Sequence, residues 1–330
     1  MNAPRTRVQR RPVHGVLLLD KPIGLSSNDA LQKVKWLLRA EKAGHTGTLD
    51  PLATGVLPLC FGAATKFSQL HLDADKTYRA IARLGQRTST GDAEGDVIET
   101  RPVNVSPQNL AQVLPRFTGA IQQIPPMYSA LKKDGKPLYE LARAGIEVER
   151  PARDVRIHTL KAVLVQSATA APAIEFVAKC SKGTYIRTLG EDIGEALGCG
   201  AHLTFLRREV TGDFDLSQCV TLPELEAMSE DERLARLLPP EALLAHHTRV
   251  TLTPQDAGYF LSGMRRRGAW PDAAQVAVFG ADPQALLGVA HIQGGELIAD
   301  RLLSPLEIEQ VLAQTQAQNL HQPIAEGQQF

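Results

Sequence analysis

The first two hundred residues combine strand-like and helix-like spacing of apolar positions. Residues 77–84 alternate, as expected of a strand buried on one side, and the inward face would carry Tyr78, Ala80, Ala82 and Leu84. Apolar runs predict further strands at about 14–20, 55–61, 155–165, 173–180 and 202–210. Helical spacing predicts helices after Ser26 and over about 63–72, 106–117 and 185–197. Because these elements are mixed without regular βαβ alternation, we predict an α+β fold.

The pattern changes several times along the chain. After Pro125-Pro126, residues 132–153 are polar and basic with one short helix, and we expect an exposed insertion. Residues 222–247 carry six acids against two arginines and predict a helical linker. Residues 250–304 predict a small unit that contains a hairpin. We expect residues 306–330 to form a short helix and a flexible tail, and residues 1–12 to be a disordered basic arm.

Composition is that of an ordinary globular protein, with 43% apolar and 22% charged residues. No run of about 18 apolar residues occurs, so we expect no membrane-spanning segment. The first residues also lack the apolar stretch and cleavage site of a secretory signal. The four cysteines lie far apart in sequence, which argues against a disulfide framework or a zinc site and favours a reducing, cytoplasmic location.

Charge is unevenly distributed, although the net charge is zero. Residues 1–221 hold 29 Lys and Arg against 22 Asp and Glu, whereas residues 222–330 hold 7 against 14. The basic front portion favours a polyanionic partner, with chance asymmetry between two domains as the alternative. The run Arg265–Arg267 is typical of solvated charge, or of contacts to a phosphate backbone if its domain binds nucleic acid.

The segment Gly44–Gly55, G-H-T-G-T-L-D-P-L-A-T-G, carries the strongest candidate for catalysis. Asp50 lies in the middle of this glycine- and threonine-rich turn and is followed by the rigid ring of Pro51. Neighbouring leucines can anchor the turn to a core. A carboxylate held on such a turn is suited to act as a nucleophile or a base.

Arg187 is the second candidate. It lies in the first turn of a predicted helix, where a cation opposes the helix dipole and gains from a carboxylate partner. Asp50 is one possible partner, and a solvated surface arginine is the alternative. If the two residues pair, the guanidinium should keep Asp50 ionised at neutral pH and orient it, which suits a nucleophile.

Several other side chains have both a functional and a structural interpretation. Tyr78 and Tyr185 could stack on a flat ligand or simply pack in the core, and His45 could stack on a base or cap its turn. Lys21, Lys66 and Lys182 flank turns, and each could contact a phosphate or be an ordinary surface lysine.

Other kinds of site find little support. The segment Gly91–Asp96 places three acids at alternating positions but lacks the later ligands of a calcium loop. The chain contains no phosphate-binding G-x-x-x-x-G-K-[ST] motif, no dinucleotide fingerprint after a strand and no G-x-S-x-G elbow. These absences argue against nucleotide cofactors and serine-hydrolase chemistry.

Taken in order, five segments resemble the bacterial tRNA pseudouridine synthases of the TruB family: Gly15–Asn28, Gly44–Pro58, Asp75–Arg79, Ile124–Lys132 and Cys180–Leu189. The resemblance runs from about residue 13 to 215 and weakens after about 220. It implies a catalytic domain over 13–247 with a mixed, mainly antiparallel sheet flanked by helices, and a thumb insertion at about 126–153. It also implies a small β-rich, PUA-like RNA-binding domain over 248–305.

The resemblance further implies residue roles. Asp50 matches the nucleophile, Tyr78 the tyrosine that stacks on the target uracil, and Arg187 the arginine paired with the aspartate. His45, Tyr185 and Leu206 match positions lining the flipped nucleotide, and Lys21-Pro22 belongs to a motif that supports the active-site loop. Lys21 and Lys66 remain candidates for binding the substrate, and Tyr78 is also a candidate base.

The implied reaction is the isomerisation of uridine 55 to pseudouridine in the T-loop of tRNA, without cofactor or metal. The expected partner is the tRNA T-arm, and we expect a monomer without an obligate protein partner. Two rivals remain at this stage: a non-catalytic tRNA-binding or folding module, and a hydrolase that uses Asp50 on a small substrate.

Overall fold

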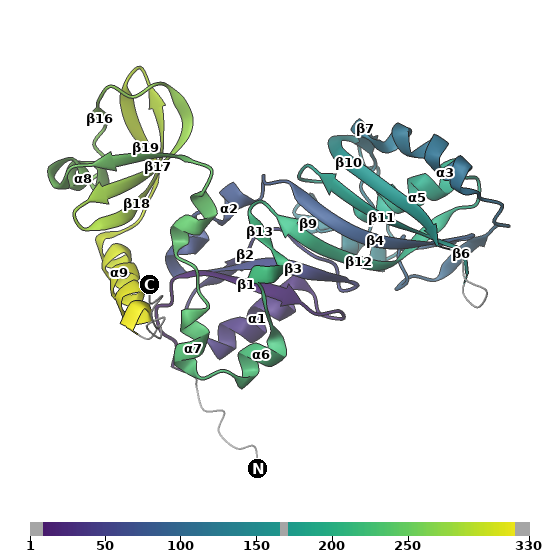
Figure 1. Ribbon diagram of the computed structural model, residues 1–330, viewed down its shortest axis with the longest axis horizontal. Helices are drawn as coiled ribbons and strands as arrows, with labels where there is room; N and C mark the ends of the chain where they lie inside the picture. The colour runs from purple at the N-terminus through teal and green to yellow at the C-terminus, as the bar shows by residue number, and fades with distance from the viewer. Residues whose placement is uncertain (1–8, 166–170, 321–330) are drawn as a thin grey trace, which may run out of the picture.

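The computed structural model describes residues 9–165 and 171–320, which contain a ten-stranded sheet, a five-stranded sheet and two short two-stranded hairpins (Figure 1). Eight strands of the ten-stranded sheet follow the order β14-β1-β3-β12-β4-β11-β10-β7, with β2 beside β3 and β13 beside β12. Its strands are β1 (Gly15–Lys21), β2 (Ala43–His45), β3 (Ala53–Phe61), β4 (Lys76–Leu84), β7 (Gly119–Gln123), β10 (Arg153–Val165), β11 (Ala173–Cys180), β12 (Ala201–Thr211), β13 (Phe214–Asp215) and β14 (Val220–Thr221).

The predicted strands are all present in this sheet. The β1–β14 and β3–β12 pairs are parallel, and the remaining pairs are antiparallel, which confirms a mixed, mainly antiparallel sheet. On β4 the predicted alternation also holds, because Ala80, Ala82 and Leu84 are buried while Arg79 and Arg83 are exposed. The α+β fold class is therefore confirmed.

The helices of this part are α1 (Ser27–Leu37), η1 (Gly62–Lys66), α2 (Ser68–His71), α3 (Pro107–Val113), η2 (Leu114–Phe117), α4 (Leu138–Arg143), α5 (Ile186–Ala196), η3 (Leu216–Gln218), α6 (Leu222–Ala227), α7 (Glu230–Ala235) and η4 (Pro240–Leu244). Two predicted helices are broken. The helix predicted over 106–117 changes to a 3-10 turn before Pro115, whose nitrogen has no hydrogen to donate. The helix predicted over 63–72 divides at Phe67, which is fully buried.

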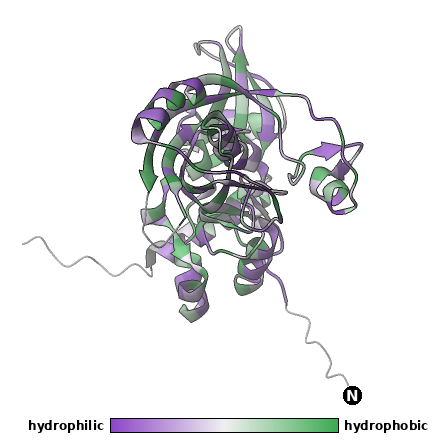
Figure 2. Cartoon of the chain, turned by 90° about the vertical axis from the view of Figure 1, so that its right-hand side faces the viewer, coloured by the Kyte–Doolittle hydropathy of each residue, from purple (hydrophilic) through white to green (hydrophobic). Residues whose placement is uncertain are grey.

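Strand β1 is buried on both faces, which explains its uninterrupted apolar sequence. Leu17 and Leu19 face a core shared with α1, α5 and α6, while Val16 and Leu18 face a second core shared with the C-terminal domain. In Figure 2 the helices carry both hydrophobic and hydrophilic residues, as expected of elements that are packed on one side only. The second core joins the C-terminal domain to the larger sheet.

The insertion between β7 and β10 is small and its charged residues are exposed, as predicted. It contains the short hairpin β8 (Lys132–Lys133) and β9 (Lys136–Pro137), followed by α4. A second hairpin, β5 (Gln86–Thr88) and β6 (Val97–Thr100), follows β4.

The predicted linker at 222–247 is packed against the sheet rather than loose. Leu238 and Val16 exchange both backbone hydrogen bonds at 2.8 Å, and Leu225 and Leu237 are buried. The acidic residues predicted its polarity, but its leucines determine where it lies.

The C-terminal domain is a five-stranded sheet in the order β15-β17-β18-β19-β16. Its elements are β15 (Thr248–Leu252), α8 (Pro254–Leu261), β16 (Arg266–Arg267), β17 (Ala273–Ala281), β18 (Gln284–Gln293), β19 (Glu296–Leu302) and α9 (Pro305–Leu320). The predicted β18–β19 hairpin is confirmed, and its turn uses Gly294 and Gly295 at positive φ.

Both predicted terminal segments are more ordered than expected where they are described. Helix α9 runs to Leu320, and Gln314 exchanges two hydrogen bonds with the backbone of His14, at 3.0 and 2.6 Å. In the predicted arm, Arg11 pairs with Glu230 at 2.5 Å. The rest of the arm, residues 1–8, and the tail, residues 321–330, lie outside the described residues. None of the described helices is long and apolar enough to cross a membrane.

Candidate active site

A cavity of about 730 Å³ lies where the Asp50 turn, the start of β4, β12 and the turn before α5 meet. It collects six of the residues singled out in the sequence, which come from four separate segments of the chain: Asp50, Tyr78, Lys182, Tyr185, Arg187 and Leu206. The insertion contributes Ser129–Leu131 to its wall. The cavity therefore lies between the sheet and the insertion.

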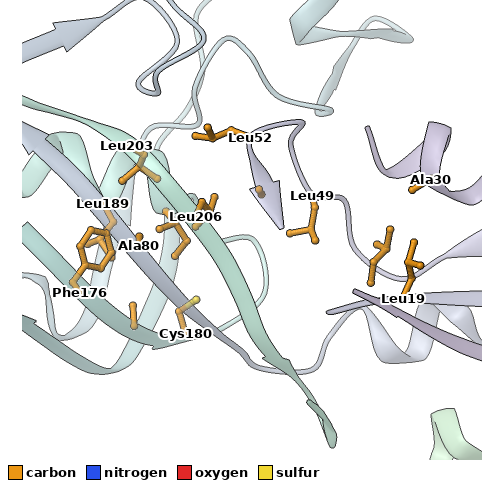
Figure 3. Close-up of a cluster of buried hydrophobic side chains, with 14 of the residues drawn as sticks. Leu19, Ala30, Leu49, Leu52, Ala80, Phe176, Cys180, Leu189, Leu203 and Leu206 are labelled. Carbon is orange, nitrogen blue, oxygen red and sulfur yellow. The ribbon is translucent and has the colours of Figure 1, made fainter. Parts of the chain in front are cut away.

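The Asp50 turn is held on both sides of the acid. The hydroxyl of Ser27, at the start of α1, accepts a hydrogen bond from the Leu49 amide at 2.7 Å and donates to its carbonyl at 3.0 Å. On the other side, the Gly24 amide donates to the Pro51 carbonyl at 2.9 Å. Leu49 and Leu52 are buried in the core, as expected, and Figure 3 shows both within the cluster that includes Leu19 and Leu206.

Arg187 and Asp50 form the predicted ion pair. The Nη2 of Arg187 lies 2.9 Å from Oδ2 of Asp50, and the same nitrogen donates to the Tyr128 carbonyl at 2.6 Å. Nη1 donates to the Thr90 carbonyl at 3.0 Å. Arg187 is only 5% exposed, so it belongs to the interior and is not a solvated surface arginine.

Asp92 completes this group, and the sequence analysis missed its role. Its Oδ2 lies 3.5 Å from Nη1 of Arg187, and its other oxygen accepts hydrogen bonds from the Thr90 hydroxyl and the Glu94 amide. In the sequence, Asp92 stands out only as one acid of an incomplete calcium-loop pattern. Among the described residues, no group of three or more His, Cys, Asp or Glu side chains is arranged to hold a metal.

The pKa of Asp50 is shifted in the opposite direction to the one that pairing with Arg187 alone would give. Burial raises the pKa of Asp50 above its ordinary value, the charge of Arg187 lowers it, and the nearby Asp92 raises it again. The net direction is upward, because loss of hydration outweighs the ion pair. Asp50 still keeps 36% of its side-chain surface exposed, so it can reach a molecule in the cavity.

Two glycines of α5 allow this helix to pack closely against β12. A Cβ at Gly190 would lie 2.8 Å from the Leu203 side chain, and one at Gly194 would lie 2.5 Å from the Ala201 backbone. Helix α5 therefore packs closely against β12 and brings Arg187, in its first turn, to Asp50.

Tyr78 and Leu206 come from adjacent strands of the sheet. Leu206 pairs with Ala80, and Tyr78 pairs with Arg208, in the β4–β12 register. Burial raises the pKa of the Tyr78 hydroxyl, and the charge of Arg208 opposes this. Arg208 also lines the cavity and was not predicted.

Tyr185 is fixed through its backbone by a buried amide. The Tyr185 amide donates to Oε1 of Gln123 at 2.9 Å, and the Gln123 amide group donates back to the Tyr185 carbonyl at 3.2 Å. Burial raises the pKa of the Tyr185 hydroxyl. Tyr185 thus links β7 to the start of α5 at the cavity wall.

Three predicted site residues do not line the cavity. Lys21 is fully buried under the turn, where its ammonium donates to the carbonyls of Pro22 and Leu25 at 2.9 and 2.5 Å. Burial lowers the pKa of Lys21 to about 8, and the charge of Asp50 opposes this. The position of Lys21 agrees with support of the turn and not with direct contact to a ligand.

His45 and Lys66 also lie outside the group of residues that line the cavity. Burial lowers the pKa of His45, and its Nδ1 is buried without a hydrogen-bond partner in the described part of the chain. Lys66 pairs with Glu307 at 2.5 Å and donates to the Leu302 carbonyl at 2.9 Å, at the boundary with the C-terminal domain. The ammonium is therefore held at this boundary and not at the cavity, and substrate binding by Lys66 stays a prediction.

Basic residues line the cavity, whereas each arginine of the run Arg265–Arg267 is paired with an acid. Lys76, Arg153 and Lys182 line the cavity, and Lys182 pairs with Asp73 across its mouth at 2.7 Å. In the C-terminal domain, the Arg265–Arg267 run is paired throughout with surface acids: Arg265 and Arg267 with Glu296, and Arg266 with Asp256.

The comparisons with known proteins agree with this geometry. Residues 35–186 match the family model of the TruB family pseudouridylate synthase N-terminal domain, and residues 187–245 match that of the tRNA pseudouridylate synthase B C-terminal domain. A protein named tRNA pseudouridine synthase B from Verminephrobacter eiseniae is 67% identical over 94% of this chain and 95% of its own length. Another of that name, from Ralstonia nicotianae, is 60% identical over 89% of this chain and 95% of its own length.

A solved structure agrees on the fold. The crystal structure of a Cbf5-Nop10-Gar1 complex contains a chain that is 26% identical, with a TM-score of 0.66 over 89% of this chain and 86% of that one. The matched segments include the Asp50 turn, Tyr78 and the residues around Arg187. On these grounds, the chain belongs to the TruB family of pseudouridylate synthases.

Proposed function

We propose that this enzyme converts uridine 55 in the T-loop of tRNA to pseudouridine, with Asp50 as the nucleophile. As a pseudouridylate synthase it is an isomerase, and tRNA is the substrate class given in the names of its relatives. The observation that carries the proposal is the position of Asp50: it lies on a rigid turn at the wall of a cavity, paired with Arg187 and partly exposed. Because its substrate is tRNA, we also expect the enzyme to act in the cytoplasm.

The reaction moves the glycosidic bond from N1 to C5 of the uracil, with no net change in atoms. The carboxylate of Asp50 would form a transient bond either to C6 of the base or to C1′ of the ribose, and both routes remain open. In each case the nucleotide must leave its stack, which costs a few kcal/mol. A cavity of about 730 Å³ can accommodate one extruded nucleotide.

The residues around Asp50 have complementary roles in this proposal. Arg187 orients the carboxylate through the 2.9 Å contact, and Tyr78 and Leu206 provide flat and apolar surface for the base. Once C5 is bonded to the ribose, its hydrogen must leave as a proton. Tyr78 is the candidate to accept it, because it lines the same cavity as Asp50.

The rest of the tRNA would be bound by basic residues on the rim and by the insertion. Arg153 and Lys182 line the open part of the cavity, and their charges suit the phosphates of a stem-loop. We further propose that the insertion closes on the T-arm and that the C-terminal domain is a PUA-like RNA-binding domain. Binding should weaken as salt rises, because phosphate contacts release counterions.

Tritium release from tRNA carrying 5-tritiated uridine tests the proposal. The wild type should release tritium and Asp50→Asn should not, although Asp50→Asn should still bind tRNA. A matched tRNA with cytidine at position 55 is the substrate control and should give no release. Equal release by wild type and Asp50→Asn would refute the role of Asp50, and release from the cytidine control would refute the position.

A further inference from the structure

Arg208 is a fully buried arginine at the wall of the Asp50 cavity. A buried cation usually has a carboxylate partner, because a charge loses its hydration in the interior. Here its bonds go to uncharged oxygens instead. Nε donates to the Val56 carbonyl at 2.7 Å and Nη2 donates to the Gly47 carbonyl at 3.3 Å, and the guanidinium lies near enough to the Tyr78 hydroxyl for its charge to act on that group's pKa. Within residues 9–165 and 171–320, no carboxylate forms an ion pair with it.

The two carbonyls that Arg208 binds lie at the two ends of the Asp50 turn. Gly47 precedes Asp50 and Val56 follows it, so one planar guanidinium holds the segment on both sides of the acid. The same side chain lies near Tyr78 on the neighbouring strand, which pairs with Arg208 in the sheet. Arg208 thus lies against the turn that carries Asp50 and beside Tyr78, the two residues that would contact the nucleotide.

Two glycines of the turn allow this close approach. A Cβ at Gly47 would lie 3.3 Å from Nη1 of Arg208, and one at Gly55 would lie 2.1 Å from the Arg208 carbonyl oxygen. Both glycines have positive φ, at +79° and +102°. The glycine pattern of the turn is therefore explained in part by the need to fold around Arg208.

Neighbouring groups also respond to the charge of Arg208. The pKa of Lys76 is lowered to about 8, by burial first and then by this charge. The pKa of His45 is lowered by the same two causes in the same order. The guanidinium therefore acts on its surroundings as a positive charge without a nearby counterion.

We propose that Arg208 is a positioning residue that fixes the Asp50 turn and the Tyr78 hydroxyl in one arrangement. Arg187 contacts the carboxylate itself, whereas Arg208 acts on it through the backbone at Gly47 and Val56. This inference rests on the proposed function, since it assigns Arg208 to the geometry of the same site. It predicts that Arg208 affects the rate of the chemical step and not the binding of tRNA.

Arg208→Lys tests the inference, because lysine keeps the charge but cannot form the same fork of hydrogen bonds. Arg207→Lys is the matched control: Arg207 is the preceding residue on β12, pairs with Asp20 at 2.6 Å and does not line the cavity. In single-turnover tritium release, Arg208→Lys should be slower by about 100-fold, as small displacements of reacting groups cost this much. Its dissociation constant for tRNA should stay within about threefold of wild type, and Arg207→Lys should match the wild type in both measurements.

A double variant separates positioning from general destabilisation. If Arg208 acts partly through the Tyr78 hydroxyl, the losses of Arg208→Lys and Tyr78→Phe should not multiply in the combined variant. Losses that do multiply, a rate for Arg208→Lys within twofold of wild type, or a loss of tRNA affinity as large as the loss of rate would each overturn the inference. Failure of the proposed function is distinguishable, because Asp50→Asn would then be as active as the wild type.

A second measurement leaves Arg208 in place, in case Arg208→Lys does not fold. In protein with 15N-labelled arginine, Tyr78→Phe should shift a slowly exchanging Nε–H signal that Arg207→Lys leaves unchanged. That signal should be distinct from the one that moves in Asp50→Asn, which would belong to Arg187. Absence of any such shift in Tyr78→Phe would also overturn the inference.

Discussion

Arginines near the cavity and arginines in the C-terminal domain show how differently the same side chain can be used. Arg187 and Arg208 are separated in sequence and buried, and both bond backbone carbonyls, while Arg187 also pairs with the Asp50 carboxylate. Arg265 and Arg267 form part of a conspicuous run, yet both are exposed and paired with the same surface acid, Glu296. The density of charge in the sequence is thus a poor guide to function, whereas the elements that deliver a single charge decide its use.

The largest expected effect comes from Arg187→Gln. Losing a charged contact to the reacting group should lower the single-turnover rate by about 100-fold or more. The active form of Asp50 is the carboxylate, and Arg187 lowers its pKa. Without Arg187 this pKa rises further, so the acidic limb of the pH–rate profile should move to higher pH. An unchanged acidic limb would show that Arg187 does not control the ionisation of Asp50.

Ser27→Ala should have the next largest effect. The buried hydroxyl bonds both backbone groups of Leu49, and its loss should lower the free energy of unfolding by about 2 kcal/mol and slow the reaction. Ser26→Ala is the matched control, because it removes the N-cap of the same helix at a cost of about 1 kcal/mol without touching the turn. Chemical denaturation and tritium release separate the two, and an equal rate loss in both variants would contradict this role for Ser27.

Lys66→Met should have a smaller effect, confined to stability. The pair with Glu307 is partly exposed, so its loss should cost about 1 kcal/mol or less. The tRNA affinity and the single-turnover rate should not change. A clear fall in tRNA affinity at unchanged stability would show that Lys66 binds the substrate.

The smallest effect is expected from replacing Arg265 and Arg267 with serine. These side chains are exposed and share one acid, so unfolding should change by about 0.5 kcal/mol or less. Because Glu296 already offsets their charge, the slope of tRNA affinity against salt should change by less than about one unit. A larger decrease in the slope would show that these arginines leave Glu296 to contact phosphates.

Much of the fold could be predicted because its signals are local. The alternation in β4, the double-sided apolar run of β1 and the glycine turn between β18 and β19 each identify an element from its own residues. The length of α9 was not predicted, because its glutamines look unstructured in sequence. In the structure, Gln314 and Gln318 bond to backbone groups near residues 14 and 234.

The site was predicted in part for the same reason. Asp50 and Arg187 lie in distinctive segments: a cation in the first turn of a helix gains from a carboxylate partner, and the family resemblance implied that this partner is Asp50. Asp92 and Arg208 were missed because each depends on contacts between distant segments: Asp92 with Arg187, and Arg208 with Gly47 and Val56. The pairing of Lys66 could not be predicted, because its partner, Glu307, comes from the other end of the chain.

The most direct test of the central claim is a structure of the enzyme bound to tRNA. It should show residue 55 extruded into the cavity beside Tyr78, with a carboxylate oxygen of Asp50 about 3–3.5 Å from C6 or C1′ of that nucleotide. A complex in which residue 55 stays stacked in the T-loop, or enters the cavity remote from Asp50, would contradict the account.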